Sequence, residues 1–101
     1  MSRLKGEYAT AAAAGTTQSD AAEVSAYTVM VTSGSGGVLL PPMNKDEECV
    51  VCNGVSTIDL SIYPRSGGQI NNSTANLPLV LPANKAARFR AIDGLNVIAF
   101  F

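Results

Sequence analysis

The chain has 101 residues, a formal net charge of −1, two Cys, and neither His nor Trp. A chain of about 100 residues forms one domain with a single modest core. Seven basic and eight acidic residues nearly cancel, so the sequence predicts no polycationic surface for nucleic acid. Without His the chain lacks the usual general base and the commonest metal ligand. We therefore expect no enzyme activity, no catalytic residues, no cofactor and no bound metal.

The apolar runs are short. The longest strongly apolar runs are residues 38–40 and 97–101, far below the ~20 residues that span a bilayer. The N-terminus carries Arg3 and Lys5 ahead of an alanine run, which is typical of a signal peptide. However, Glu7 and Thr10 interrupt the N-terminal segment, and residues 15–20 follow without an apolar central region. We expect a soluble, non-exported protein without membrane contact.

The composition changes near residue 25. Residues 1–25 are rich in Ala, Thr and Ser and have few large apolar side chains. Such a segment buries too little apolar area to offset its own ordering entropy. Three interpretations stay open: a flexible tail, an extended arm that orders on the surface of a partner, and a short helix near residues 8–14 docked on its own domain, since Ala favours helix. For the domain organisation we predict an extended N-terminal arm over residues 1–25.

From residue 26 onward the pattern is typical of β structure. β-Branched and aromatic residues are enriched, and apolar and polar side chains alternate within the apolar segments. Turn signals containing Gly, Asn or Pro separate these segments at intervals of ~8–12 residues. We therefore predict an all-β domain over residues 26–101, a small antiparallel β-sandwich of about seven short strands. The expected strands are residues 26–32, 38–40, 48–52, 57–63, 77–82, 85–92 and 95–101.

Cys49 and Cys52 form a CxxC pair. In redox enzymes such a pair lies at a helix N-terminus, which lowers the thiol pKa. Here the pair lies in an expected strand, where residues three apart point to opposite faces. A structural zinc site would need two further ligands. We expect Cys49 to be a small core residue and Cys52 to have no role in chemistry.

Two charged groups stand out in the β region. Asp46, Glu47 and Glu48 form an acidic cluster without the spacing of a calcium loop. They form either a solvated face or a site for a basic patch on a partner. Arg88 and Arg90 lie two apart on one strand and project from the same face, roughly 7 Å apart. They form either a polar outer face or an ion-pair site between subunits.

The last strand, residues 97–101, is apolar on both faces and ends in Phe100 and Phe101. An exposed apolar edge strand invites pairing or burial. We expect this strand to be covered by other copies of the chain. The alternative is a central strand that is buried on both faces within one monomer.

Four segments occur in a characteristic order: GGVLLP at residues 36–41, VCNG at 51–54, LSIYPRSGGQIN at 60–71 and FRAIDG at 89–94. This succession resembles small β-sandwich modules of tailed-bacteriophage virion proteins, which include capsid cement (decoration) proteins and modules of tail or head fibres. The resemblance covers roughly residues 27–101. Such modules often carry Trp shortly after the equivalent of residues 93–94, where this chain has Leu95.

The resemblance implies a structural role. Cement proteins of this kind are homotrimers on the outer surface of the capsid, where they bind the major capsid protein and hold neighbouring capsomers together. The arm would then bind the capsid, and the charged and aromatic residues of the last strands would form the subunit interface. The expected capsid contacts are Arg3, Leu4, Lys5 and Tyr8, and the expected interface residues are Arg88, Arg90, Phe100 and Phe101.

Two other classes remain as alternatives. The first is a receptor- or glycan-binding module of a phage fibre, for which the available tyrosines are Tyr8, Tyr27 and Tyr63. The second is a small enzyme that uses the acidic cluster or the two Cys.

Overall fold

The computed structural model describes residues 8–24, 28–55, 57–71 and 74–100, and this part of the chain is all-β without a helix. It forms nine strands, so the prediction of about seven was too low. The strands are β1 (Tyr8–Ala13), β2 (Ala22–Glu23), β3 (Thr28–Gly34), β4 (Gly36–Leu39), β5 (Glu48–Asn53), β6 (Leu60–Tyr63), β7 (Leu79–Leu81), β8 (Ala86–Ala91) and β9 (Val97–Phe100).

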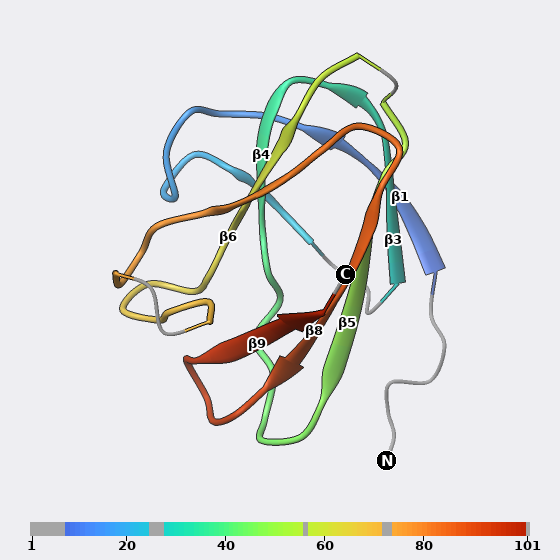
Figure 1. Cartoon of the computed structure of the whole chain (residues 1–101). Helices are drawn as coiled ribbons and strands as arrows, with labels where there is room; N and C mark the ends of the chain where they lie inside the picture. The colour runs from blue at the N-terminus through green and yellow to red at the C-terminus, as the bar shows by residue number, and fades with distance from the viewer. Residues whose placement is uncertain (1–7, 25–27, 56, 72–73, 101) are drawn as a thin grey trace.

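The strands form two sheets, ordered β1-β3-β5-β8-β9 and β2-β4-β6-β7 (Figure 1). From β1 to β6 each strand lies in the opposite sheet from the one before it. Between two neighbouring strands of one sheet, the chain therefore passes once through the other sheet. Each such pair of neighbours runs parallel. Among the nine strands of the described residues, the pairs β6–β7, β5–β8 and β8–β9 are antiparallel.

This winding corrects the prediction of an antiparallel fold. Tyr8 lies opposite Thr28, and Thr28 lies opposite Val50. The chain therefore needs 20 and then 22 residues to pass through the other sheet and return to its place beside the previous strand. The tight step between β3 and β4 is one reason for the error. Gly34 and Gly36 have φ of +83° and +108°, and this step carries the chain into the other sheet instead of folding it back on β3. A Gly-rich turn signal looks the same in both cases.

The two sheets share one hydrophobic core. Its largest fully buried side chains include Phe89 from β8, Ile62 from β6 and Leu81 from β7, so both sheets contribute. The expected alternation in β8 is confirmed, because Ala87, Phe89 and Ala91 are buried whereas Arg88 and Arg90 are exposed. In β5 the buried set includes Cys49 and Val51, as the strand pattern predicts.

Residues 8–24 belong to both sheets. β1 pairs with β3 and β2 pairs with β4, and Ala13 and Val24 are buried in the core. The possible helix at residues 8–14 is wrong, since this stretch is mostly strand. Small alanine side chains fit the edge position, and the hydrogen bonds to β3 override the intrinsic helix preference. The arm residues Arg3, Leu4 and Lys5 lie outside the described residues, as does the side chain of Tyr8.

β9 lies at one edge of the five-stranded sheet, so the alternative of a central strand is wrong. Val97 is buried, whereas Ile98 and Phe100 are exposed. The outer edge of β9 is covered by the segment 69–71. The Val97 amide donates to the Gln69 carbonyl, the Asn71 amide donates to the Val97 carbonyl, and the Ala99 amide donates to Asn71 Oδ1, at 2.9–3.0 Å. Phe101 lies outside the described residues.

Candidate functional site

The register of β5, β8 and β9 brings two rows of side chains together on the outer face of the five-stranded sheet. Glu48, Arg90 and Ile98 lie opposite one another in one row. The next row places Val50, Arg88 and Phe100 side by side. Opposite residues in adjacent strands point to the same face, so these side chains form one continuous surface. We define the β8–β9 face as these six residues, Glu48, Val50, Arg88, Arg90, Ile98 and Phe100, together with Asp46, which lies just before β5 and pairs with Arg90.

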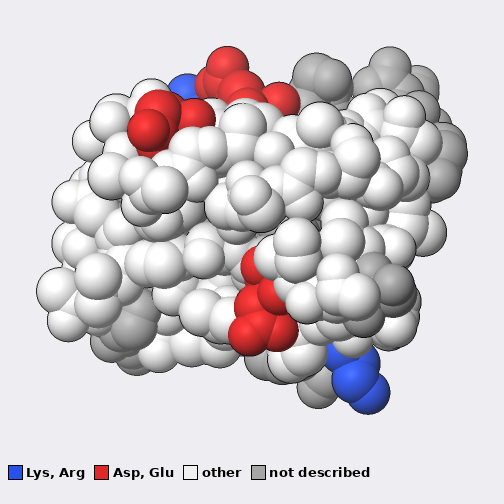
Figure 2. All heavy atoms as spheres, turned by 90° about the horizontal axis from the view of Figure 1, so that it is seen from above, with Lys and Arg blue, Asp and Glu red and all other residues white. Residues whose placement is uncertain are grey.

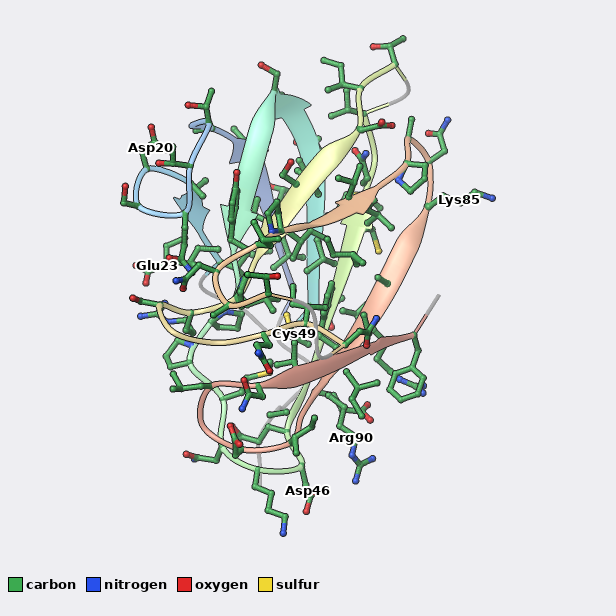
Figure 3. All side chains as sticks on the ribbon, turned by 60° about the vertical axis from the view of Figure 1, so that its left-hand side comes forward. Asp20, Glu23, Asp46, Cys49, Lys85 and Arg90 are labelled. Atoms are coloured by element: carbon green, nitrogen blue, oxygen red, sulfur yellow. The ribbon has the colours of Figure 1, made fainter. Side chains whose placement is uncertain are left out.

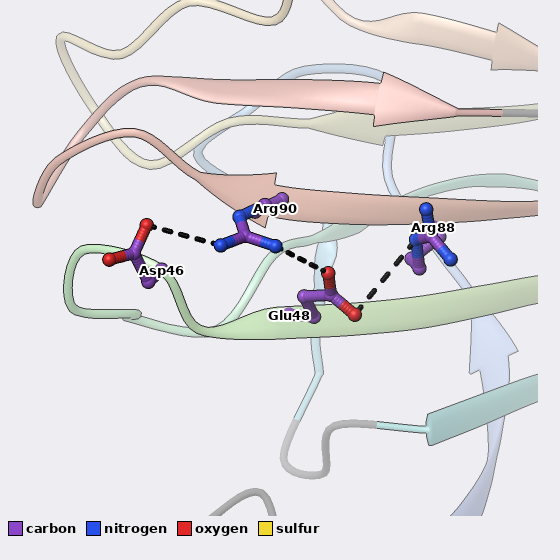
Figure 4. Close-up of polar contacts among 4 residues, drawn as sticks. All are labelled: Asp46, Glu48, Arg88 and Arg90. Carbon is purple, nitrogen blue, oxygen red and sulfur yellow. Dashed lines mark hydrogen bonds and ion pairs between the residues drawn. The ribbon is translucent and has the colours of Figure 1, made fainter.

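Ion pairs cross this face (Figure 4). Arg90 Nη1 lies 3.3 Å from Glu48 Oε2, and Arg90 Nη2 lies 3.4 Å from Asp46 Oδ1. Arg88 Nε lies 3.9 Å from the other oxygen of Glu48. Asp46, Arg90 and Lys85 point outward, whereas Cys49 lies inside the fold (Figure 3). Since the arginine side chains are about half exposed, each pair contributes roughly 0–1 kcal/mol to stability. The cluster orders four charges whose sum is zero.

Apolar and aromatic groups lie beside these charges. Ile98 is 40% exposed and Phe100 is 43% exposed. The Arg88 guanidinium carbon lies 4.9 Å from the centroid of the Phe100 ring, within cation–π range. A folded chain that presents an aromatic ring, an aliphatic side chain and ordered arginines on one regular surface has the composition of a protein–protein interface.

The structure brings together three of the four residues predicted for a subunit interface: Arg88, Arg90 and Phe100. Asp46 and Glu48 pair with these arginines within the same chain, which was not predicted from the sequence. Ile98 belongs to the same surface and was likewise not predicted as a site residue. The period-two alternation in β5 and β8 shows which residues share a face. The alternation would therefore have placed Glu48 beside Arg90 if the pairing of β5 with β8 had been known.

The two cysteines point to opposite faces of β5, as predicted. Cys49 is buried and Cys52 is half-buried, and they form no disulfide. Burial raises the pKa of the Cys49 thiol to about 12. Cys52 lines a shallow depression of about 310 Å³ together with Met30, Lys85 and Ala86. Among the residues that the structure describes, no group of three or more Cys, Asp or Glu could hold a metal ion.

A second cluster lies over the four-stranded sheet, where the segment between β1 and β2 contacts the loop after β6. The Tyr63 hydroxyl donates to the Thr16 carbonyl at 3.2 Å, and Gln18 Nε2 donates to the Pro64 carbonyl at 2.7 Å. Arg65 Nη1 lies 2.6 Å from Glu23 Oε2. These contacts leave Tyr63 only 8% exposed. Tyr63 therefore presents no aromatic face for stacking on a sugar ring.

Seen from above, the surface is mostly uncharged, with acidic groups in separate places (Figure 2). Within the described ranges no helix has the length and apolar character to cross a bilayer. No protein-family model, curated protein or solved structure matches the chain.

Proposed function

We propose that this chain is a structural protein of a phage particle, a capsid cement (decoration) protein that binds the outer surface of the capsid as a homotrimer. The observation that carries the proposal is the β8–β9 face, an ordered surface with half-exposed apolar side chains and four charges that sum to zero. The resemblance of residues 36–41, 51–54, 60–71 and 89–94 to phage virion modules supports the same class. Two sheets around one core fit the β-sandwich of such modules.

In this proposal the β8–β9 face packs against neighbouring copies. Aromatic residues and arginine are enriched in interface cores, and Arg88 and Phe100 supply both. Burial of Ile98 and Phe100 would remove the two exposed apolar side chains of β9 from water. Since the charges on the face balance, copies can approach one another without net repulsion.

In this proposal a different part of the chain binds the major capsid protein. Residues 8–24 are bound within the chain's own two sheets. The capsid-binding segment in this proposal is therefore the stretch before β1, with Arg3, Leu4 and Lys5. A trimer presents three such segments at once, and a capsid offers many sites. Weak single contacts then add up to tight binding through effective concentration.

The test compares phage particles made with and without the gene for this chain. We expect many copies of the protein on each particle and release of DNA at a lower temperature from particles that lack it. The copy number is measured by quantitative gel densitometry or mass spectrometry, and DNA release by dye fluorescence during heating. A few copies per particle would place the protein in a tail or fibre. Equal heat resistance of the two kinds of particle would contradict the cement function.

A further inference from the structure

The four sheet edges differ in how they are protected against pairing with another strand. The outer edge of β9 is hydrogen-bonded to the segment 69–71. β7 has three residues and lies between Pro78 and Pro82, which lack amide donors. β2 has only two residues. Short edges, prolines and covering segments are the usual devices that prevent strands of different molecules from pairing.

β1 has none of these devices. It is six residues long, Tyr8–Ala13, and its sequence YATAAA contains no charge and no Pro. It pairs with β3 on one side, and none of the described residues pairs with its other side. Thr10 and Ala12 are exposed on the outer face, whereas Ala9 and Ala11 pack against the core. An uncharged edge strand of this length presents unpaired amides and carbonyls to any second strand.

We propose that β1 pairs antiparallel with β1 of a second copy of this chain and joins two five-stranded sheets into one continuous sheet. The strand is compatible with itself, because it has no charges that would repel across the contact and no side chain larger than Thr between residues 9 and 13. The contact uses main-chain hydrogen bonds, the mode of strand addition at a sheet edge. It does not involve the β8–β9 face.

Geometry restricts the register of this pair. Residues opposite each other in an antiparallel pair point to the same face of the sheet, and successive residues alternate. A two-fold axis through the sheet must therefore place one residue opposite its own counterpart. Centring on Thr10 pairs Thr10 with Thr10, Ala9 with Ala11 and Ala12 with Tyr8. Cross-strand Thr pairs stabilise sheets, which favours the register centred on Thr10.

The inference is separate from the proposed function, because it can be measured on the purified protein without capsids. A single short strand pair is weak, so we expect association that rises with protein concentration. On a crowded surface the same pair would become effective, because neighbouring copies are held at high local concentration. If the cement proposal holds, β1 pairs would connect neighbouring trimers.

The first test uses sedimentation velocity of the full chain over a range of concentrations. Thr10→Lys and Thr10→Glu each place like charges opposite one another, and we expect each to weaken association about tenfold or more. An equimolar mixture of the two variants should restore association, because opposite charges then face each other. Thr32→Lys is the matched control, since Thr32 is exposed on the neighbouring strand β3 and lies outside the contact. Unchanged association of Thr10→Lys would overturn the proposal, as would the absence of association in the wild-type chain.

The second test measures the register by oxidation with a glutathione redox buffer. Thr10→Cys in a Cys52→Ser background should form a disulfide-linked dimer, because Cα atoms opposite each other in an antiparallel pair are about 4.5–5.5 Å apart. Ala12→Cys in the same background is the control and should cross-link much more slowly. Equal rates would contradict the proposed register. On assembled particles, a Thr10→Cys cross-link to the capsid protein in place of a second copy would show that another protein occupies this edge, which would overturn self-pairing.

Discussion

At the scale of single residues, Gly37 has a steric role that the amino-acid composition does not reveal. The stretch SGSGG at residues 33–37 is typical of a turn, but Gly37 is buried within β4. A Cβ atom at this position would lie 2.7 Å from Tyr63 Cε2 and 2.8 Å from the Ser61 carbonyl oxygen. The absence of a side chain at Gly37 thus lets the Tyr63 ring lie against the sheet, where its hydroxyl reaches the Thr16 carbonyl.

We expect Gly37→Ala to lower the free energy of unfolding by about 1–3 kcal/mol, because the added methyl group must displace the Tyr63 ring or the strand β6. The measurement is chemical denaturation followed by circular dichroism. Gly94→Ala is the matched control, since a Cβ atom there meets nothing within 4 Å. Similar losses in the two variants would argue against a specific contact between Gly37 and Tyr63.

At the same scale, the burial of Asn53 could not be predicted from the sequence. The pair Asn53–Gly54 predicts a tight turn, and Asn53 is indeed the last residue of β5. It is also fully buried, which the sequence does not indicate. Its Nδ2 donates to the carbonyls of Ile58 and Leu81 at 2.8 and 3.1 Å, and its Oδ1 accepts from the Val55 amide at 3.1 Å. Asn serves equally in exposed turns, so only the tertiary structure distinguishes the two roles.

At the scale of elements, alternation predicts the faces of a strand but not its neighbours. The alternating pattern of β8 correctly separated Ala87 and Phe89 from Arg88 and Arg90. The parallel pairs β1–β3 and β3–β5 were not predictable in this way, because pairing depends on how the chain crosses between sheets. β1 had no strand signal, since alanine is depleted in strands. Its conformation depends on hydrogen bonds to β3.

Deletion of residues 1–24 should therefore destabilise the domain. Without β1 and β2, the edges of β3 and β4 would become exposed, and the core would lose Ala13 and Val24. We expect a large fall in the midpoint of thermal unfolding, or no folded protein at all. Deletion of residues 1–7 alone is the control and should retain a cooperative transition, because it leaves both strands in the chain. A folded, equally stable protein after deletion of residues 1–24 would show that this segment is an accessory arm.

At the scale of the whole molecule, two outward-facing features coexist on one five-stranded sheet. The outer edge of β1 is uncharged and offers main-chain groups. The β8–β9 face lies toward the opposite edge and offers side chains. A small domain with a modest core gains buried area from contacts between copies. Contacts at both ends of one sheet would allow trimers to form through one surface and to associate through the other.

The proposed trimer gives a prediction that separates these two surfaces. Arg88→Glu would place a carboxylate opposite Phe100 and near Glu48, which removes the cation–π contact and unbalances the charges of the β8–β9 face. We expect the molar mass of the purified protein, measured by multi-angle light scattering, to fall from that of three chains toward that of one or two. The reason is that like charges across a contact cost several kcal/mol. Lys85→Glu is the matched control, since Lys85 is exposed and lies outside this face. An unchanged mass for Arg88→Glu would exclude the β8–β9 face as the trimer interface, whereas the concentration-dependent pairing through β1 would persist in either case.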